Sequence, residues 1–146
     1  MYLLDTNVVS ELRKAKTGKA NANVVLWARE ALHDSMFLSV VTIMEIETGI
    51  LRIQKRDKEQ AAILSRWFTE QVLRNFENKI LDVSLEVARA CAQMHASNPK
   101  SERDALIGAT AQVNNLILVT RNIKDFSGSN IAVLNPWTEL ADTISA

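Results

Sequence analysis

The chain has little of the residues that cross-link or interrupt a fold. Its 146 residues include four glycines, two prolines and one cysteine, Cys91. A single cysteine excludes an internal disulfide and suits a reducing compartment. Because glycine and proline are scarce and 47% of the residues are hydrophobic, the composition excludes a disordered or low-complexity chain. It favours a compact, helix-rich one.

Neither sign of charge is in excess, and no long hydrophobic run occurs. Lys plus Arg and Asp plus Glu each number 17, so the formal net charge is zero. No overall field therefore attracts nucleic acid or membrane, although a local basic rim can coexist with acids elsewhere. No apolar run is long enough to span a bilayer and no secretory leader is recognisable, which predicts a cytoplasmic protein without membrane contact. The length predicts one domain, residues 1–146.

Short apolar runs alternate with stretches of helical periodicity. The runs are typical of buried parallel strands and lie at residues 2–4, 36–41, 80–83, 116–119 and, as an edge strand, 131–134. Helices are predicted over residues 8–12, 21–33, from 42 onward, 58–76, 84–96 and 101–115. This alternation predicts a three-layer α/β/α fold with a central, mainly parallel sheet. Two of the helices form a hairpin inserted between strands.

Four acids are expected near the carboxyl ends of strands. Asp5 and Asp125 follow strands, Glu45 lies one turn into a helix that follows a strand, and Asp104 lies one turn into a later helix. Ligands of such sheets bind beyond the strand ends, so the four side chains should share one crevice. Carboxylates gathered in one place repel one another unless a cation balances them. Mg²⁺ or Mn²⁺ is the simplest such cation, and such a site can hydrolyse phosphodiesters.

Most of these acids also have a purely structural explanation. Thr42 and Glu45 have the spacing of a capping box in which Thr42 starts a helix, and Ser101 and Asp104 resemble another. Asp5 could be a plain N-cap. The combination of acids, not any one of them, therefore carries the metal-site hypothesis.

Other candidate sites in the sequence are weaker. Cys91 and His95 are spaced as zinc ligands on a helix, but a buried thiol and a surface imidazole explain them more simply. A phosphoacceptor receiver domain would place an Asp where Thr42 follows its strand. Residues 13–19 are basic and predict a solvated loop, with polyanion contact as the alternative. Gly49 is expected to allow a close backbone approach.

Four segments resemble the PIN domain family of ribonucleases, and within it the VapC-type toxins of toxin–antitoxin pairs. The segments are LLDTNVVSE (3–11), SVVTIMEI (39–46), DALIGATA (104–111) and LVTRNIKDF (118–126). They occur in the family's order and with similar spacing over nearly the whole chain. The final LNPW (134–137) resembles the FitB-like branch.

The resemblance implies a Mg²⁺- or Mn²⁺-dependent endoribonuclease that cuts structured RNA. Carried over by motif, the metal-site acids are Asp5, Glu45 and Asp104, with Asp5 and Asp104 as direct ligands and Glu45 acting directly or through water. The fourth acidic position falls on Asp125 or on the place occupied by Asn122, which leaves one metal or two open.

Further residues are expected to support this chemistry. Thr6, Asn7, Thr120 and Asn122 would orient the carboxylates and water, as metal sites generally require. Arg103 and Arg121 could bind RNA phosphates at the rim, or be ordinary surface charges. They extend the predicted catalytic set of Asp5, Glu45, Asp104 and Asp125.

The resemblance also implies partners. It points to a homodimer and to a VapB-like or FitA-like antitoxin that binds operator DNA, so that this chain would meet DNA only indirectly. An apolar groove beside the helical hairpin could accept a partner helix. Two alternatives stay open, namely a catalytically silent PIN-fold binding module and a DNA-directed nuclease.

Overall fold

The computed structural model describes residues 1–138 and 144–145 and has a central sheet of six strands. Their order is β3-β2-β1-β4-β5-β6. The strands are β1 (Tyr2–Leu4), β2 (Met36–Ser39), β3 (Ile80–Leu81), β4 (Ile117–Val119), β5 (Val133–Leu134) and β6 (Ile144–Ser145). All neighbours pair in parallel except β6, which is antiparallel to β5. The expectation that residues 131–134 form an edge strand is therefore wrong, because β5 is paired on both sides.

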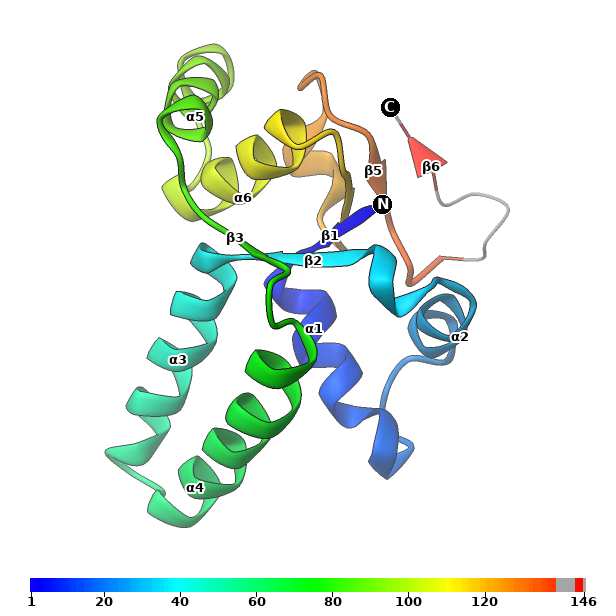
Figure 1. Cartoon of the computed structure of the whole chain (residues 1–146), viewed down its shortest axis with the longest axis vertical. Coiled ribbons are helices and arrows are strands. Elements are labelled where there is room, and N and C mark those ends of the chain that lie inside the picture. The colour runs from blue at the N-terminus through cyan, green and yellow to red at the C-terminus, as the bar shows by residue number, and fades with distance from the viewer. Residues whose placement is uncertain (139–143, 146) are drawn as a thin grey trace.

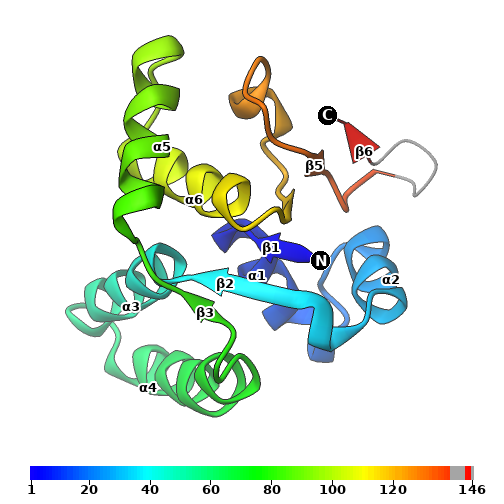
Figure 2. The same cartoon turned by 45° about the horizontal axis from the view of Figure 1, so that its top comes forward.

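Helices cover both faces of this sheet. They are α1 (Thr6–Arg13), α2 (Ala22–Glu30), α3 (Val40–Gln54), α4 (Lys58–Trp67), α5 (Leu85–Ser97) and α6 (Glu102–Val113). In Figures 1 and 2, α5 and α6 lie on one side of the strands, and α1, α3 and α4 lie on the other. The predicted three-layer α/β/α fold is confirmed, as is the α3–α4 hairpin. Among the described residues, no helix has both the length and the apolar character that a membrane span requires.

Successive strand residues face opposite helical layers. Leu3 and Leu118 belong to the core beneath α5 and α6, whereas Leu4 and Val119 belong to the core that α1, α3 and α4 share. All four are almost completely buried. A strand buried on both faces has no polar side, which explains why these runs show no alternation of apolar and polar residues.

The junction between β2 and α3 differs from the sequence prediction. The strand ends at Ser39, whose Oγ accepts a hydrogen bond from the Val41 backbone N–H (3.0 Å) and caps α3. Thr42 therefore lies inside the first turn, and the predicted capping box with Glu45 does not form. Both residues are thus available for tertiary contacts.

One smaller expectation is refined and another is wrong. The predicted loop at residues 13–19 is mostly exposed, as expected, and contains a 3₁₀-helix, η1 (Lys14–Thr17). A Cβ added at Gly49 would meet no atom within 4 Å, so no close approach occurs there. The close approach is at Gly108 of α6, where a Cβ would lie 2.7 Å from the Phe126 ring. Gly108 thereby lets the 3₁₀-helix η4 (Ile123–Phe126) pack directly onto α6.

Candidate active site

Asp5 is the most firmly held acid of the crevice. It follows β1 and is the N-cap of α1, and its Oδ1 accepts a hydrogen bond from the Thr6 backbone N–H (2.7 Å). Its Oδ2 accepts one from the Thr120 hydroxyl at the end of β4 (2.8 Å). The residue is only 6% exposed. Two adjacent parallel strands therefore fix both oxygens of a buried carboxylate.

The surroundings of Asp5 disfavour its charged form. Burial raises the pKa of Asp5 from 3.8 to about 6, although the hydrogen bonds from Thr120 and Thr6 act in the opposite direction. The negative charges of Asp104 and Glu45 raise this pKa further. The three acids predicted to form the metal site are thus close enough to interact electrostatically, and a bound cation would relieve the cost of ionising Asp5.

Glu45 is oriented by a short chain of hydroxyl groups. Its Oε1 lies 2.7 Å from the Thr6 Oγ1, which in turn lies 3.1 Å from the Thr42 Oγ1. Thr6 has one hydroxyl hydrogen, and the shorter contact, to the carboxylate, takes it. The completely buried Thr42 then donates to Thr6. Sequence reasoning missed Thr42 because it placed this residue at a helix start.

Asp104 and Asp125 occupy a more open part of the crevice. Both line a cavity of about 280 Å³ that also contains Lys100 and Lys124. The backbone N–H of Asp104 donates to the Ser101 Oγ (3.1 Å), which caps α6 as predicted. Asp104 is half-buried and Asp125 is exposed. Asp104 therefore lies between Asp125, with which it shares this cavity, and Asp5, whose pKa its negative charge raises.

The residues expected to orient these acids meet at the Thr120 hydroxyl. Besides donating to Asp5, the Thr120 Oγ1 accepts from the backbone N–H of Asn122 (3.1 Å) and lies 3.5 Å from the Asn7 Nδ2. The Asn7 Oδ1 accepts from the backbone N–H of Arg121 (3.4 Å). Asn122 thus contributes to this network through its backbone.

The two predicted substrate-binding arginines lie at different places on the rim. The Arg103 Nη1 is 4.0 Å from the Glu45 Oε2. The Arg121 guanidinium lies over the Trp137 ring, 5.3 Å from its centre. Trp137 is held by a hydrogen bond from the Asn23 side chain to its carbonyl (2.8 Å). The Trp137 ring therefore supports the Arg121 guanidinium at the rim. Sequence reasoning did not connect Trp137 with the site.

The donor set suits a hard divalent cation. Asp5, Glu45 and Asp104 offer only carboxylate oxygens, and Mg²⁺ is usually held by one or two carboxylates, with waters and substrate phosphates completing its coordination. Within residues 1–138 and 144–145, no group of three or more His, Cys, Asp or Glu side chains lies close enough together to hold a metal ion. An ion at these acids would therefore be coordinated directly by one or two carboxylates, with waters or phosphate oxygens as its other ligands.

The surroundings of Cys91 do not favour the alternative zinc pair. Cys91 is buried, and burial raises the pKa of its thiol, which disfavours the thiolate that zinc requires. The His95 Nδ1 accepts a hydrogen bond from the Lys100 backbone N–H (3.3 Å). The simpler interpretation of a packed thiol and a surface imidazole agrees with this geometry.

The fold and the acidic crevice together define the class of protein: the chain belongs to the PIN domain family, whose model matches residues 2–127. It is similar to Toxin FitB of Neisseria gonorrhoeae, with 30% identity over 142 residues, 94% of this chain and 99% of FitB. VapC ribonuclease Y4jK of Sinorhizobium fredii is 28% identical over 142 residues, 94% of this chain and 98% of that protein. The crystal structure of FitAcB from Neisseria gonorrhoeae has a TM-score of 0.84 at 29% identity, covering 94% and 99% of the two chains.

Proposed function

We propose that this protein is a metal-dependent endoribonuclease toxin of a toxin–antitoxin pair. It hydrolyses phosphodiester bonds in structured RNA in the cytoplasm. The observation that carries the proposal is the buried Asp5, held at both oxygens and acted on by the charges of Asp104 and Glu45. An acidic site of this kind in a member of the PIN family, similar to a VapC ribonuclease along its length, supports a nuclease.

Different residues of the site would bind the metal ion and the RNA. Asp5, Asp104 and Glu45 would hold Mg²⁺ or Mn²⁺, which when bound lowers the pKa of a water and stabilises the negative charge that develops on the phosphate. Thr120 and Thr6 keep the carboxylates of Asp5 and Glu45 in fixed orientations.

The arginines and the fourth acid act nearer the substrate. Arg103 and Arg121 attract RNA phosphates at the rim, where their positive charge also limits repulsion between the acids and the RNA. Asp125 supplies the fourth acidic side chain, beside Asp104 in the open cavity. Of the two positions considered for this role, only that of Asp125 carries a carboxylate.

The activity is held in check by a VapB-like or FitA-like antitoxin, and the toxin itself is a homodimer. The similarity to FitB and to the FitAcB structure supports such a partner. A cavity of about 240 Å³ between α1 and residues 67–76 has Leu12, Trp67, Val72 and Phe76 among its lining residues, and an amphipathic antitoxin helix could fill it. DNA is reached through the antitoxin.

Cleavage of a defined RNA by the purified protein tests the proposal. Wild type, Asp5→Asn and Asp104→Asn are compared with Mn²⁺, with Mg²⁺ and with EDTA. We expect discrete products from wild type with either metal, and none with EDTA or from the variants. Equal cleavage by all three proteins would indicate a contaminating nuclease.

The same assay separates the two alternatives. A single-stranded DNA of the same sequence should survive, and its cleavage at a similar rate would favour a DNA-directed nuclease. A catalytically silent binding module would slow the migration of the RNA in a native gel but would not cut it with either metal or with EDTA. Induction in cells with and without the antitoxin, followed by mapping of RNA ends, would identify the RNA that is cut.

A further inference from the structure

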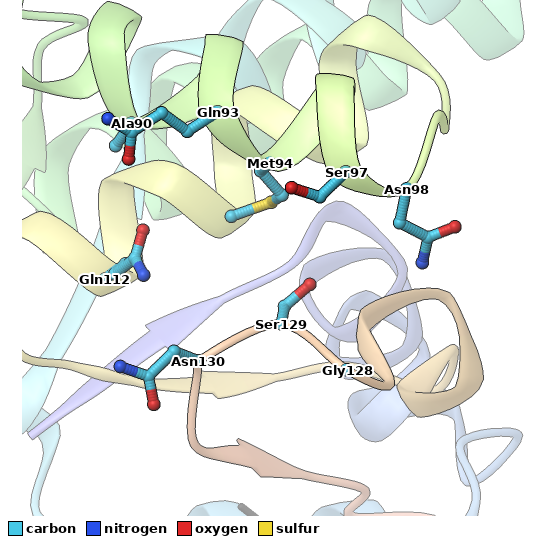
Figure 3. A pocket seen from close by; sticks show the side chains of 9 residues that line it. All are labelled: Ala90, Gln93, Met94, Ser97, Asn98, Gln112, Gly128, Ser129 and Asn130. Atoms are coloured by element: carbon cyan, nitrogen blue, oxygen red, sulfur yellow. The ribbon is translucent and has the colours of Figure 1, made fainter.

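A second cavity, lined by uncharged polar side chains, lies beside the acidic one. It has a volume of about 160 Å³ and lies between α5, the end of α6 and the turn at residues 128–130. Figure 3 shows amide and hydroxyl side chains along it, with Met94 between them on α5. None of its nine lining residues is charged; the polar ones are Gln93, Ser97, Asn98, Gln112, Ser129 and Asn130.

Asn98 joins this cavity to the acidic crevice. It lines both the uncharged cavity and the cavity that contains Asp104 and Asp125. The next residues along the chain, Pro99 and Lys100, line the acidic side only. A ligand that extends along α5 from the acids would therefore enter the uncharged cavity directly.

Among residues 1–138 and 144–145, the local hydrogen bonds leave the Asn98 and Ser129 side chains available to a ligand. The backbone N–H of Asn98 donates to the Met94 carbonyl (3.0 Å), and the Asn98 carbonyl accepts from the Lys100 Nζ (3.1 Å). In the facing turn, the Ser129 backbone N–H donates to the Phe126 carbonyl (3.1 Å). Backbone groups thus hold both walls, while the Asn98 amide and the Ser129 hydroxyl can bond to a ligand.

The size and chemistry of the cavity select one kind of ligand. A cavity of about 150 Å³ is large enough to hold a six-membered aromatic ring. Side-chain amides carry both donors and acceptors, which match the edges of nucleobases, and the buried Met94 offers a polarisable apolar contact for a ring. A phosphate would find no cation here, and an apolar peptide side chain would face mostly polar groups.

We propose that this cavity binds one unpaired nucleobase of the RNA, next to the scissile phosphate. This inference rests on the proposed ribonuclease function and adds a specificity subsite to it. Lys100 and Lys124 would contact the intervening phosphate at the acidic cavity, and the amides along α5 would read the edge of the adjoining base. Single-stranded RNA is recognised in this way, through bases turned out toward amide and hydroxyl groups.

Side-chain amide NMR signals of the metal-free protein test binding without catalysis. The probes are the four RNA homotrinucleotides and an abasic trinucleotide with the same backbone, all added in EDTA. We expect saturable shifts of the NH₂ signals of Gln93, Asn98, Gln112 and Asn130 with at least one base-bearing probe. The abasic probe should shift only the region of Lys100 and Lys124. Identical shift patterns from abasic and base-bearing probes would overturn the proposal.

Cleavage preference tests the same subsite in the active enzyme. RNA with randomised positions around one cut site is digested and the ends are sequenced for wild type, Gln93→Ala, Asn130→Ala and the control Gln60→Ala, an exposed glutamine on α4. Because amide pairs to a base edge contribute about 1–3 kcal/mol of discrimination, we expect a preference of about fivefold or more at one flanking position. Gln93→Ala and Asn130→Ala should flatten that preference and Gln60→Ala should keep it.

The outcomes distinguish this inference from the proposed function. An unchanged preference in Gln93→Ala and Asn130→Ala would overturn the base subsite while leaving the nuclease intact. If wild type cuts no RNA at all, the proposed function fails, and the NMR titration still decides whether the cavity binds a base.

Discussion

The two walls of the acidic crevice are built in different ways. The inner wall carries Asp5 and Glu45, whose oxygens accept hydrogen bonds from Thr120, Thr6 and the α1 backbone. The outer wall carries Asp104 and Asp125, which share a cavity with Lys100 and Lys124. Asp5 is buried, whereas Asp125 is exposed. Asp5 is therefore shielded from solvent and held at both oxygens, whereas Asp125 is open to solvent and shares its cavity with two lysines.

This difference suggests a division of roles within one site. Burial strengthens the electrostatic interactions of Asp5, since solvent screens them little. Solvent and the neighbouring lysines screen the outer acids. The inner wall is therefore suited to holding an ion in a fixed place, and the outer wall to accommodating the varied shape of an RNA strand.

The largest difference should separate Asp5 from Asp125. We expect Asp5→Asn to lower kcat/KM for RNA on the order of 10³-fold, or about 4 kcal/mol, because it removes a charge that we propose holds the ion. Asp125→Asn should lower it only about tenfold. Single-turnover cleavage with Mn²⁺ measures both. Equal losses of kcat/KM in Asp5→Asn and Asp125→Asn would show that both walls hold the ion, and would contradict the proposed difference between them.

The buried carboxylate of Asp5 should make stability depend on pH in the metal-free protein. Its folded-state pKa of about 6 lies above the unfolded value of 3.8, so its contribution is greatest below pH 3.8 and is lost as the pH rises through 6. The total is on the order of 2–3 kcal/mol. Asp5→Asn should therefore gain stability relative to wild type between pH 4 and pH 8.

Thermal unfolding in EDTA at several pH values measures this effect, and the difference between the two proteins isolates Asp5 from all other titrating groups. For a chain of this size, a stability change of about 2–3 kcal/mol corresponds to a shift of several degrees in Tm. Saturating Mn²⁺ should stabilise wild type at pH 8 and leave Asp5→Asn almost unchanged. A wild-type-minus-variant difference that stays constant with pH would contradict the assigned environment of Asp5.

The hydroxyl chain behind Glu45 should have an intermediate effect. Thr42→Val removes the donor to Thr6, and we expect Mn²⁺ to bind about tenfold more weakly, within the range typical of groups that orient metal ligands. Thr110→Val is the matched control, since Thr110 is equally buried but donates only to the Leu106 carbonyl of its own helix (2.7 Å).

A double-mutant cycle shows whether Thr42 acts through Thr6. In a Thr6→Val background, Thr42→Val should weaken Mn²⁺ binding little further, because the link to Glu45 is already broken. Calorimetric titration gives the affinities. Additive losses, or an equal loss in Thr110→Val, would mean that the hydroxyl of Thr42 serves only the packing of α3.

The smallest effect is expected at the rim. Arg121→Ala should raise KM a few-fold without changing kcat, and should reduce the slope of log KM against log salt by about one. Trp137→Leu should reproduce part of this change, because the ring presents the guanidinium. Arg29→Ala, an exposed arginine of α2, is the control. A fall in kcat in Arg121→Ala would place this arginine at the inner wall.

Local sequence predicted well those parts of the protein that depend on neighbouring residues. The apolar runs gave the strands β1 and β4, and the capping roles of Asp5 and Ser101 were correct. The junction after β2 was misplaced because Ser39 and Thr42 are both good caps, and only the pairing of β2 with β3 decides where the strand ends. The same ambiguity hid the contact between Thr42 and Thr6.

The layers of this protein and the candidate acids could be recognised from the amino-acid sequence, because burial on two faces and helix capping leave periodic and local signals. The differences between these acids arise only in the folded protein. Burial raises the pKa of Asp5 even though the hydrogen bond from Thr120 lowers it, whereas Asp125 is solvent-exposed. The uncharged cavity beside α5 also depends on segments that are distant in the sequence, residues 90–98, Gln112 and residues 128–130. No local pattern encodes such differences, because they arise from how far each side chain lies from water and from its distant neighbours.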